Sequence, residues 1–251
     1  MSHPIRLTPS LREKVWGRTH LSPWFPDSEQ PIGEAWYLTD RDLPLLVKLL
    51  FTSEKLSVQV HPEDGEDGPR GKTEMWHILE ADPGATIALG FREPITRERL
   101  RESTRTGEIE QLLNWIPVHA GETYFTPAHT VHAIGAGIVL CEIQQNSDVT
   151  YRLWDYGRPR ELHIDQAVAV ADLTVHPGAS HSNQVRSKHF ITERIELNGS
   201  YTPEPQECQL MICLGGSAAI DGHPVRPGEV WLLPAPALIE GAATFLRTYV
   251  P

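Results

Sequence analysis

Four residues in the first half of the chain have the types and spacing of a metal site. Gln59 and His61 are two residues apart in an alternating segment, so both side chains fall on one face of a strand. Glu74 follows a loop rich in glycine and acidic residues, and His132 ends a second polar segment. Zinc accepts imidazole and oxygen ligands, and an incomplete protein shell leaves room for water or substrate. A lone strand histidine is more often structural, so the prediction depends on all four residues.

The segment that ends at His132 resembles a motif of the cupin superfamily. It reads Gly121-x5-Pro127-x-His129-x2-His132, whereas the cupin pattern is Gly-x5-Pro-x-Gly-x2-His. Cupins are small antiparallel jelly-roll barrels whose mouth holds a metal. Their first motif usually contains His-x-His, where this chain has Gln-x-His. His129 replaces a usual glycine; it could support a metal ligand, but we expect it at a turn or at the rim of the site.

Longer blocks resemble one branch of that superfamily, the type I mannose-6-phosphate isomerases. These blocks are residues 45–48, 56–62, 71–76, 134–137 and 142–158, the last reading EIQQNSDVTYRLWDYGR. They follow the order of that family, while the C-terminal third of the chain matches it only weakly. The resemblance implies a zinc-dependent aldose–ketose isomerase that interconverts D-mannose 6-phosphate and D-fructose 6-phosphate, with one Zn²⁺ per chain.

The resemblance also implies roles for individual residues. The metal ligands would be Gln59, His61, Glu74 and His132, and the catalytic residues would be Arg152, Lys72, Glu142 and Asp148. Arg152 would stabilise the enediolate that forms as a proton moves between C1 and C2, or would clamp the phosphate. Lys72 would hold substrate oxygens or shuttle a proton. Either Glu142 or Asp148 could be the base that moves the proton, and either could instead orient Arg152. Without the family, Arg152 would be read as a surface residue paired with Asp148 or Asp155.

Short strands must position these residues. Leu45–Phe51 is a nearly continuous apolar run that suits a strand buried on both faces, and residues 56–61 alternate strictly. Glycine and proline number 19 and 21, which favours many turns over a helical bundle. Helices are expected only at residues 95–102, at residues 107–115 with Thr106 as N-cap, and near residues 164–172. We therefore expect an all-β fold, a cupin jelly-roll barrel with short inserted helices.

Two segments resemble each other and bear on domain organisation. Residues 119–128 and 226–235 each contain a Gly-Glu pair, a short strand and a Pro-Ala exit. The alternative is convergence of two turns on the same chemistry. If the repeat is real, residues 1–175 form the metal-binding catalytic domain, and residues 176–251 form a smaller, degenerate cupin-like β-domain without metal. The boundary would fall near residues 175–180.

Composition and charge exclude several classes of partner. The chain has 22 basic and 33 acidic residues, a net charge of -11, which argues against nucleic acid and anionic membranes. No stretch approaches the roughly 20 apolar residues of a membrane span, and no apolar signal core begins the chain. Cys141, Cys208 and Cys213 lack metal or redox spacing and read as reduced thiols of a cytoplasmic protein. We expect a small sugar phosphate as partner, and a monomer or homodimer.

Two other functions are open at the level of sequence. One is a non-catalytic cupin that binds a sugar phosphate, although a degenerate copy usually loses its ligands first. The other is a different cupin enzyme, such as an iron oxygenase, whose pocket is usually apolar, whereas Lys72 and Arg152 suit an anionic substrate. The native metal is open too, because such a site would also take cobalt, manganese or nickel.

Overall fold

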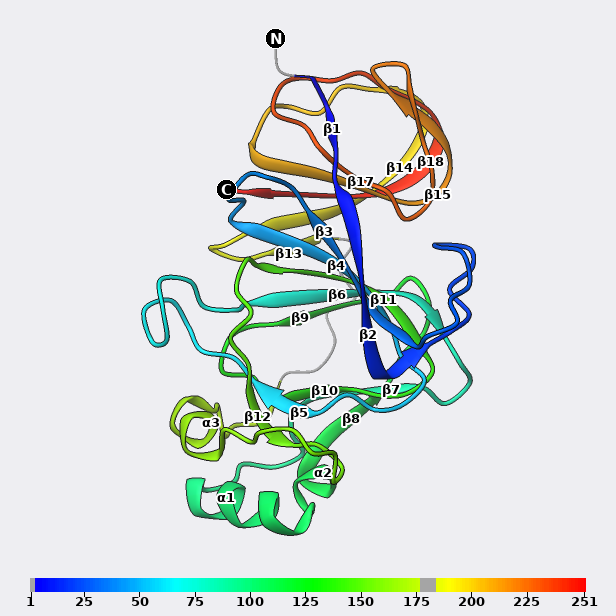
Figure 1. The fold of residues 1–251 in the computed structure, drawn as a ribbon. Helices are drawn as coiled ribbons and strands as arrows, with labels where there is room; N and C mark the ends of the chain where they lie inside the picture. Colours follow the sequence, from blue (N-terminus) through cyan, green and yellow to red (C-terminus); the bar gives the residue numbers. More distant parts are fainter. Residues whose placement is uncertain (1–2, 177–183) are drawn as a thin grey trace.

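The computed structural model describes residues 3–176 and 184–251, and strands dominate this part of the chain (Figure 1). The named strands form three sheets, and their pairings are antiparallel. Short helices gather at one end of the molecule, beside one sheet. The all-β class expected from the density of strands and turns is confirmed.

A six-stranded sheet forms one wall of the first barrel. Its order is β2 (Thr8–Arg18), β3 (Ile32–Leu38), β4 (Leu45–Phe51), β11 (Ile138–Gln145), β6 (Glu74–Ala81) and β9 (Thr123–Thr126). Every residue of β4 is buried, as its apolar run predicts. The register of β4 and β11 places Lys48 opposite Glu142, so two charged side chains meet inside the barrel.

A five-stranded sheet forms the opposite wall. Its order is β12 (Tyr151–Trp154), β5 (Val58–Val60), β10 (His132–Ile134), β7 (Thr86–Phe91) and β8 (Leu113–Pro117). Gln59 of β5 lies opposite His132 on one side and Arg152 on the other. A buried cluster joins Leu50 and Trp76 of the first wall to residues of the second, so the two sheets enclose one core. This arrangement is the expected jelly-roll barrel.

The helices pack on the outer face of the five-stranded sheet. They are α1 (Arg97–Thr106), α2 (Ile109–Leu112) and α3 (Ile164–Val170), and Leu100, Ile109 and Ala167 join the apolar cluster around Val58. The expectation for residues 107–115 was wrong in two respects. Thr106 ends α1 rather than capping a new helix, because Gly107 adopts a left-handed φ of 79°. Pairing with β7 then draws the chain into β8 from Leu113 onward. In the described residues, no helix has the length and apolar character of a bilayer span.

The third sheet contains most of the C-terminal strands. It runs β1 (Ile5–Arg6), β17 (Val230–Leu232), β15 (Glu207–Ile220), β18 (Ile239–Val250), β14 (Ile191–Tyr201) and β13 (Gln184–Arg186), and β16 (His223–Val225) pairs with β15. The N-terminal β1 thus joins a sheet of late strands. Val47 and Phe51 share one core cluster with Phe190 and Leu210. The division into residues 1–175 and 176–251 stays a prediction, and residues 177–180 of its boundary lie outside the described residues.

The two similar segments adopt the same turn. Gly121 donates a hydrogen bond to the Ile78 carbonyl and Gly228 donates one to the Cys213 carbonyl, both at 2.8 Å. The two glycines have φ values of 89° and 83°, which side chains rarely adopt. The turns lead into β9 and β17, which pair with β6 and β15 respectively. The same turn therefore precedes a paired strand at both places, while the relation between the two units stays a prediction.

The core shared by the six-stranded sheet and the C-terminal sheet predicts that the two sheets unfold together. Phe190 is fully buried and packs edge-on against Phe125, with ring centroids 6.4 Å apart. Phe190→Ala should lower the free energy of unfolding by about 3–5 kcal/mol and keep one transition in urea. The control is Val15→Ala, which changes an exposed side chain and should shift stability by less than about 0.5 kcal/mol. Two separate unfolding transitions in urea, only one of which is shifted by Phe190→Ala, would contradict a shared core.

The lowered pKa of His77 predicts that the fold loses stability in acid. Burial and the nearby Arg194 lower the pKa of His77 to about 4, whereas an unfolded histidine has a pKa of about 6.5. The unfolded chain therefore binds more protons, and stability falls as pH drops from about 6.5 to about 4. His77→Phe should remove up to about 3 kcal/mol of that fall, measured by urea unfolding at pH 7 and pH 4. An unchanged pH dependence would show that His77 is already solvated.

Candidate metal centre and substrate cavity

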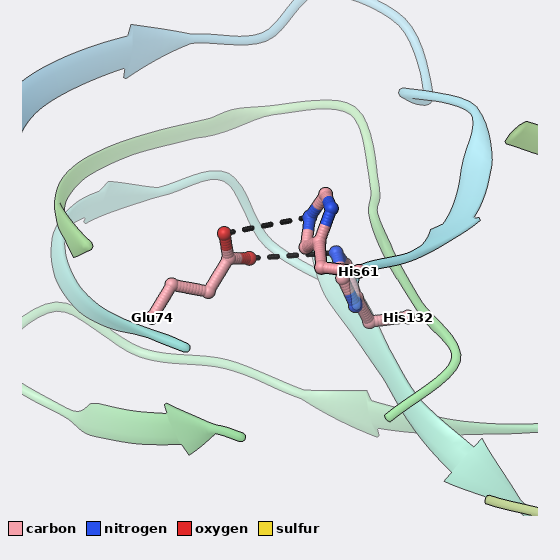
Figure 2. A group of neighbouring side chains, drawn as sticks. All are labelled: His61, Glu74 and His132. Carbon is pink, nitrogen blue, oxygen red and sulfur yellow. Dashed lines mark ion pairs between the residues drawn. The ribbon is translucent and has the colours of Figure 1, made fainter. Parts of the chain in front are cut away.

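Three buried side chains converge inside the first barrel (Figure 2). His61 follows β5, Glu74 begins β6 and His132 begins β10, and their potential ligand atoms all lie within 4.8 Å of one another. The Glu74 oxygens lie 3.6 Å from His61 Nε2 and 3.4 Å from His132 Nε2. Three strands distant in sequence thus bring together three of the four predicted ligands.

Backbone carbonyls fix the protonation of both imidazoles. Nδ1 of His61 lies 2.9 Å from the Val149 carbonyl, and Nδ1 of His132 lies 2.8 Å from the Thr130 carbonyl. A carbonyl only accepts, so each Nδ1 donates and each Nε2 keeps its lone pair. Burial lowers the pKa of His61 well below its usual value and that of His132 to about 4. Both rings are therefore neutral at pH 7, in the form that binds metals.

The Glu74 carboxylate has fewer donors than a buried charge needs. It is fully buried, and apart from the Lys72 ammonium no group among the described residues donates to either oxygen. Its ion-pair partner is Lys72, whose Nζ lies 3.1 Å away. Burial raises the pKa of Glu74 because it penalises the charged form. A buried carboxylate that has one ammonium partner and lies between two neutral imidazoles fits a divalent cation.

Gln59 and Lys72 border this group. The Gln59 amide nitrogen lies 3.3 Å from His132 Nε2, and half a turn of the amide would place Oε1 there instead. Lys72 Nζ lies 3.0 Å from His61 Nε2, so its ammonium contacts both His61 and Glu74. The positions are compatible with the roles predicted for Gln59 and Lys72, which stay predictions.

A cavity of about 260 Å³ opens beside the three-residue group. It is lined by Lys14, Trp16, Glu34, Trp36, Lys48, Leu50, Leu56, Ser57, Gln59, Lys72, Glu142, Asp148, Thr150, Arg152 and Arg160. Gln59 and Lys72 therefore connect the cavity to the deeper His61–Glu74–His132 group. All four predicted catalytic residues line it, so the topology brings Lys72 together with the three residues of the 142–158 block.

Glu142 is held as an anion in the cavity wall. Lys48 lies 2.9 Å from one carboxylate oxygen, and the Trp76 indole donates to the other at 3.1 Å. Burial alone would raise the pKa of Glu142, but Lys48 and Lys72 outweigh it and lower that pKa. Lys48 is a residue that the sequence analysis left without a role. The available signal was a charged residue inside the apolar run LLVKLLF.

Arg152 and Asp148 are the more exposed of the four predicted catalytic residues. Arg152 is half-buried on β12, and one of its nitrogens donates to the Glu161 carbonyl at 2.9 Å. It forms no ion pair with Asp148 or Asp155 in the described residues, so the alternative interpretation of a surface pair is not what the structure contains. Asp148 is exposed on the loop before β12.

The β2–β3 hairpin supplies a cavity wall that the sequence analysis did not foresee. Lys14 lies 3.0 Å from Glu34, and the Trp36 indole donates to the same carboxylate at 3.2 Å. The Lys48 ammonium also lies over the Trp36 ring, 4.4 Å from a ring centroid. Polar residues alternate with buried ones in this hairpin, but that pattern also fits an ordinary solvent-exposed face.

Two further histidines take structural positions. His129 has a φ of 70° at the position where the cupin pattern has glycine, which confirms the expected turn. His189 lies 3.2 Å from Glu63 and 3.7 Å from Asp64, and these three residues form a second potential metal group. That group is partly exposed, and Asp64 already accepts hydrogen bonds from Gly71 and Gln145. It therefore lacks the buried carboxylate found at Glu74.

Known proteins resemble this chain over nearly its whole length. No family model matches it. A mannose-6-phosphate isomerase of Streptococcus mutans is 31% identical over an alignment 297 positions long, which covers 93% of each chain. Mannose-6-phosphate isomerase ManA of Bacillus subtilis is 30% identical with the same coverage.

Solved structures agree with these relatives. The crystal structure of a mannose 6-phosphate isomerase from Bacillus subtilis superimposes with a TM-score of 0.87 and 28% identity, over 99% of this chain and 100% of that one. A putative mannosephosphate isomerase from Archaeoglobus fulgidus has a TM-score of 0.83 at 17% identity, over 100% and 98% of the two chains, which is a likeness of fold. On these sequence relationships, the chain belongs to the mannose-6-phosphate isomerase family.

Proposed function

We propose that this protein is a zinc-dependent isomerase that interconverts D-mannose 6-phosphate and D-fructose 6-phosphate. The observation that carries the proposal is the Glu74 carboxylate, which is buried between two neutral imidazoles with Lys72 as its one cationic partner, beside a cavity rich in cations. The relatives named mannose-6-phosphate isomerase support the same substrate. A cytoplasmic location and a monomeric or homodimeric state stay predictions.

The proposed metal ligands are His61, Glu74 and His132, with Gln59 as the fourth after rotation of its amide. When bound, the ion would supply Lewis-acid stabilisation of the negative charge that develops on the sugar oxygens O1 and O2. One backbone carbonyl accepts from Nδ1 of each histidine, and this hydrogen bond keeps Nε2 of the same ring directed at Glu74. This support preorganises the site before any ligand arrives.

Lys72 acts in the proposal as a hydrogen-bond donor to substrate oxygens. Burial would lower the pKa of Lys72, but the charges of Glu74 and Glu142 outweigh it and raise that pKa. Lys72 is therefore a cation at neutral pH and cannot accept a proton as a base. Its ammonium lies where the cavity meets the metal group, so it can hold an oxygen of the reacting carbons.

Glu142 is the carboxylate that we propose for proton transfer between C1 and C2. It is buried and lies in the same wall as Lys72, whereas Asp148 is exposed on a loop. The reacting carbons must lie near the metal group, which favours the deeper carboxylate. Lys48 and Trp76 hold both oxygens of Glu142 in place, so the proton acceptor would be oriented without the substrate.

The overall proposal is tested by turnover of fructose 6-phosphate with and without a chelator. We expect conversion by the zinc-loaded protein, loss of conversion after chelation, and recovery when zinc is added. Binding of fructose 6-phosphate without conversion would instead identify a non-catalytic cupin. Oxygen uptake in place of isomerisation would identify an oxygenase.

His61→Ala should lose the metal and the activity while keeping the barrel. One ligand is removed, but the strand ladder and the other buried groups remain. Zinc content is measured by elemental analysis and fold by circular dichroism. The matched control is His189→Ala, which removes the histidine of the partly exposed group and should keep one zinc per chain. Full zinc content in His61→Ala, with loss of zinc in His189→Ala, would place the metal at the other group.

Glu142→Gln should lower kcat by roughly 10²–10⁴, the usual contribution of a positioned general base, with zinc content unchanged. The matched control is Asp148→Asn, which changes the exposed carboxylate of the same cavity. Steady-state kinetics in both directions measure the effect, and thermal unfolding checks that Lys48 tolerates the loss of its partner. If Glu142→Gln is folded and within threefold of the wild-type rate while Asp148→Asn is inactive, Asp148 is the base.

A further inference from the structure

A separate cavity of about 300 Å³ lies between the first strands of the chain and the C-terminal sheet. It is lined by residues 6–9, by three aromatic side chains and by the turn at residues 226–229. None of these residues lines the cavity beside the metal group. Neighbouring residues of a strand point to opposite faces, and on β3 Trp36 lines the substrate cavity while Tyr37 lines this one. The six-stranded sheet therefore separates the two cavities.

Hydrogen bonds hold the walls of this separate cavity in place. The Tyr37 hydroxyl donates to the Gly228 carbonyl, and the Leu7 amide donates to the Val230 carbonyl at 2.9 Å. Both Tyr37 and Leu7 are buried. Gly228 packs against Trp24, because a Cβ added at this glycine would lie 3.5 Å from Trp24 atoms. The cavity is therefore formed before a ligand arrives, as is usual for small-molecule sites.

The carboxylate of this cavity is already satisfied within the wall. Arg6 lies 3.1 Å from one oxygen of Glu229. The other oxygen accepts from the Arg226 backbone at 3.3 Å and from the Trp231 indole at 3.2 Å. The Arg226 guanidinium has no partner in the part of the chain that the structure describes. Two guanidinium groups and one occupied carboxylate leave the cavity with an excess of positive charge, although the whole chain has a net charge of -11. This local charge favours an anion.

Aromatic surface forms much of the remaining lining. Trp24, Phe25 and Tyr37 line the cavity together with Leu7 and two prolines. Trp24 and Phe25 are partly exposed, so part of their ring surface contacts water. A flat ligand would bury that surface and stack on the rings. The volume of about 300 Å³ lies at the lower end of the usual range of ligand pockets, roughly 300–1,000 Å³, which limits the occupant to a small molecule.

We propose that this cavity is a further ligand site, which binds a small, flat aromatic molecule carrying one acidic group. The acidic group would pair with the Arg226 guanidinium, which has no competing partner, while the rings lie against Trp24 and Phe25. The inference does not depend on the proposed isomerase activity, because no residue of this site lines the substrate cavity. A bound ligand contacts both β2 and the turn before β17, so it should also stabilise the folded chain.

Two probes with the same rings test whether the site requires an anion. Anilinonaphthalene sulfonate becomes fluorescent when its rings leave water, and phenylnaphthylamine lacks only the sulfonate. We expect the wild type to bind the sulfonate saturably at one site per chain and the uncharged probe at least about threefold more weakly. Arg226→Gln should raise the dissociation constant of the sulfonate by about three- to tenfold and leave that of the uncharged probe unchanged.

Thr8→Trp tests the position of the site without removing any wall of it. Thr8 is exposed at the start of β2 and lines the cavity, so a large side chain there should fill it. Tryptophan is well tolerated in strands, and thermal unfolding without probe checks that the variant is folded. Both probes should lose saturable binding to Thr8→Trp, and the sulfonate should no longer raise its melting temperature.

The matched control is Arg152→Gln, which removes an unpaired guanidinium from the substrate cavity and should bind the sulfonate as the wild type does. Equal affinities for the sulfonate in the wild type, Arg226→Gln and Thr8→Trp would overturn the proposal. A loss of binding in Arg152→Gln alone would place the probe in the substrate cavity and would overturn it too. The absence of saturable binding to the folded wild type up to about 1 mM sulfonate would have the same consequence.

Discussion

The buried negative charge of Glu74 is the constraint on which the site depends. A carboxylate removed from water is stable only with nearby cations or donors, and here one lysine and two neutral imidazoles surround it. Glu142 adds a second buried anion, so the barrel contains two carboxylates and two lysines within one polar interior. Neutral histidines add no charge to this group. A divalent cation would supply the missing attraction at the point where the two Nε2 lone pairs and Glu74 converge.

The register of the strands places these polar side chains inside the barrel. Glu142 lies opposite Lys48 across β11 and β4, while Gln59 lies between His132 and Arg152 in the facing sheet. A shift of one residue in any of these ladders would turn the charged side chains out of the barrel. The helices cover the outer face of the second sheet, and the C-terminal sheet shares a core with the first (Figure 1). The polar site therefore sits inside a barrel whose walls are supported on both outer sides.

Sequence reasoning was most successful where a local pattern carried the chemistry. Alternation put Gln59 and His61 on one strand face, and the motif around His132 predicted both a ligand position and the turn at His129. The resemblance of the blocks between residues 45 and 158 predicted the family and the fold class. Neither the location of zinc nor the catalytic roles are tested by the fold itself, and they stay proposals.

The features that sequence reasoning missed depend on contacts between distant segments. The Lys48–Glu142 pair requires the register of two strands 94 residues apart, and Trp36 reaches the cavity only because β3 lies beside β4. The helix expected over residues 107–115 is confined to Ile109–Leu112, because pairing with β7 draws the chain into β8 from Leu113 onward. Arg160 lies outside any recognised motif and enters the cavity because its loop folds back onto β12.

Anomalous diffraction at the zinc edge, from a crystal grown with zinc and fructose 6-phosphate, tests the central claim most directly. The account predicts one strong peak bounded by Gln59, His61, Glu74 and His132, with the sugar phosphate extending from that peak through the cavity. A peak only at Glu63, Asp64 and His189, or no peak inside the barrel at full zinc saturation, would contradict it.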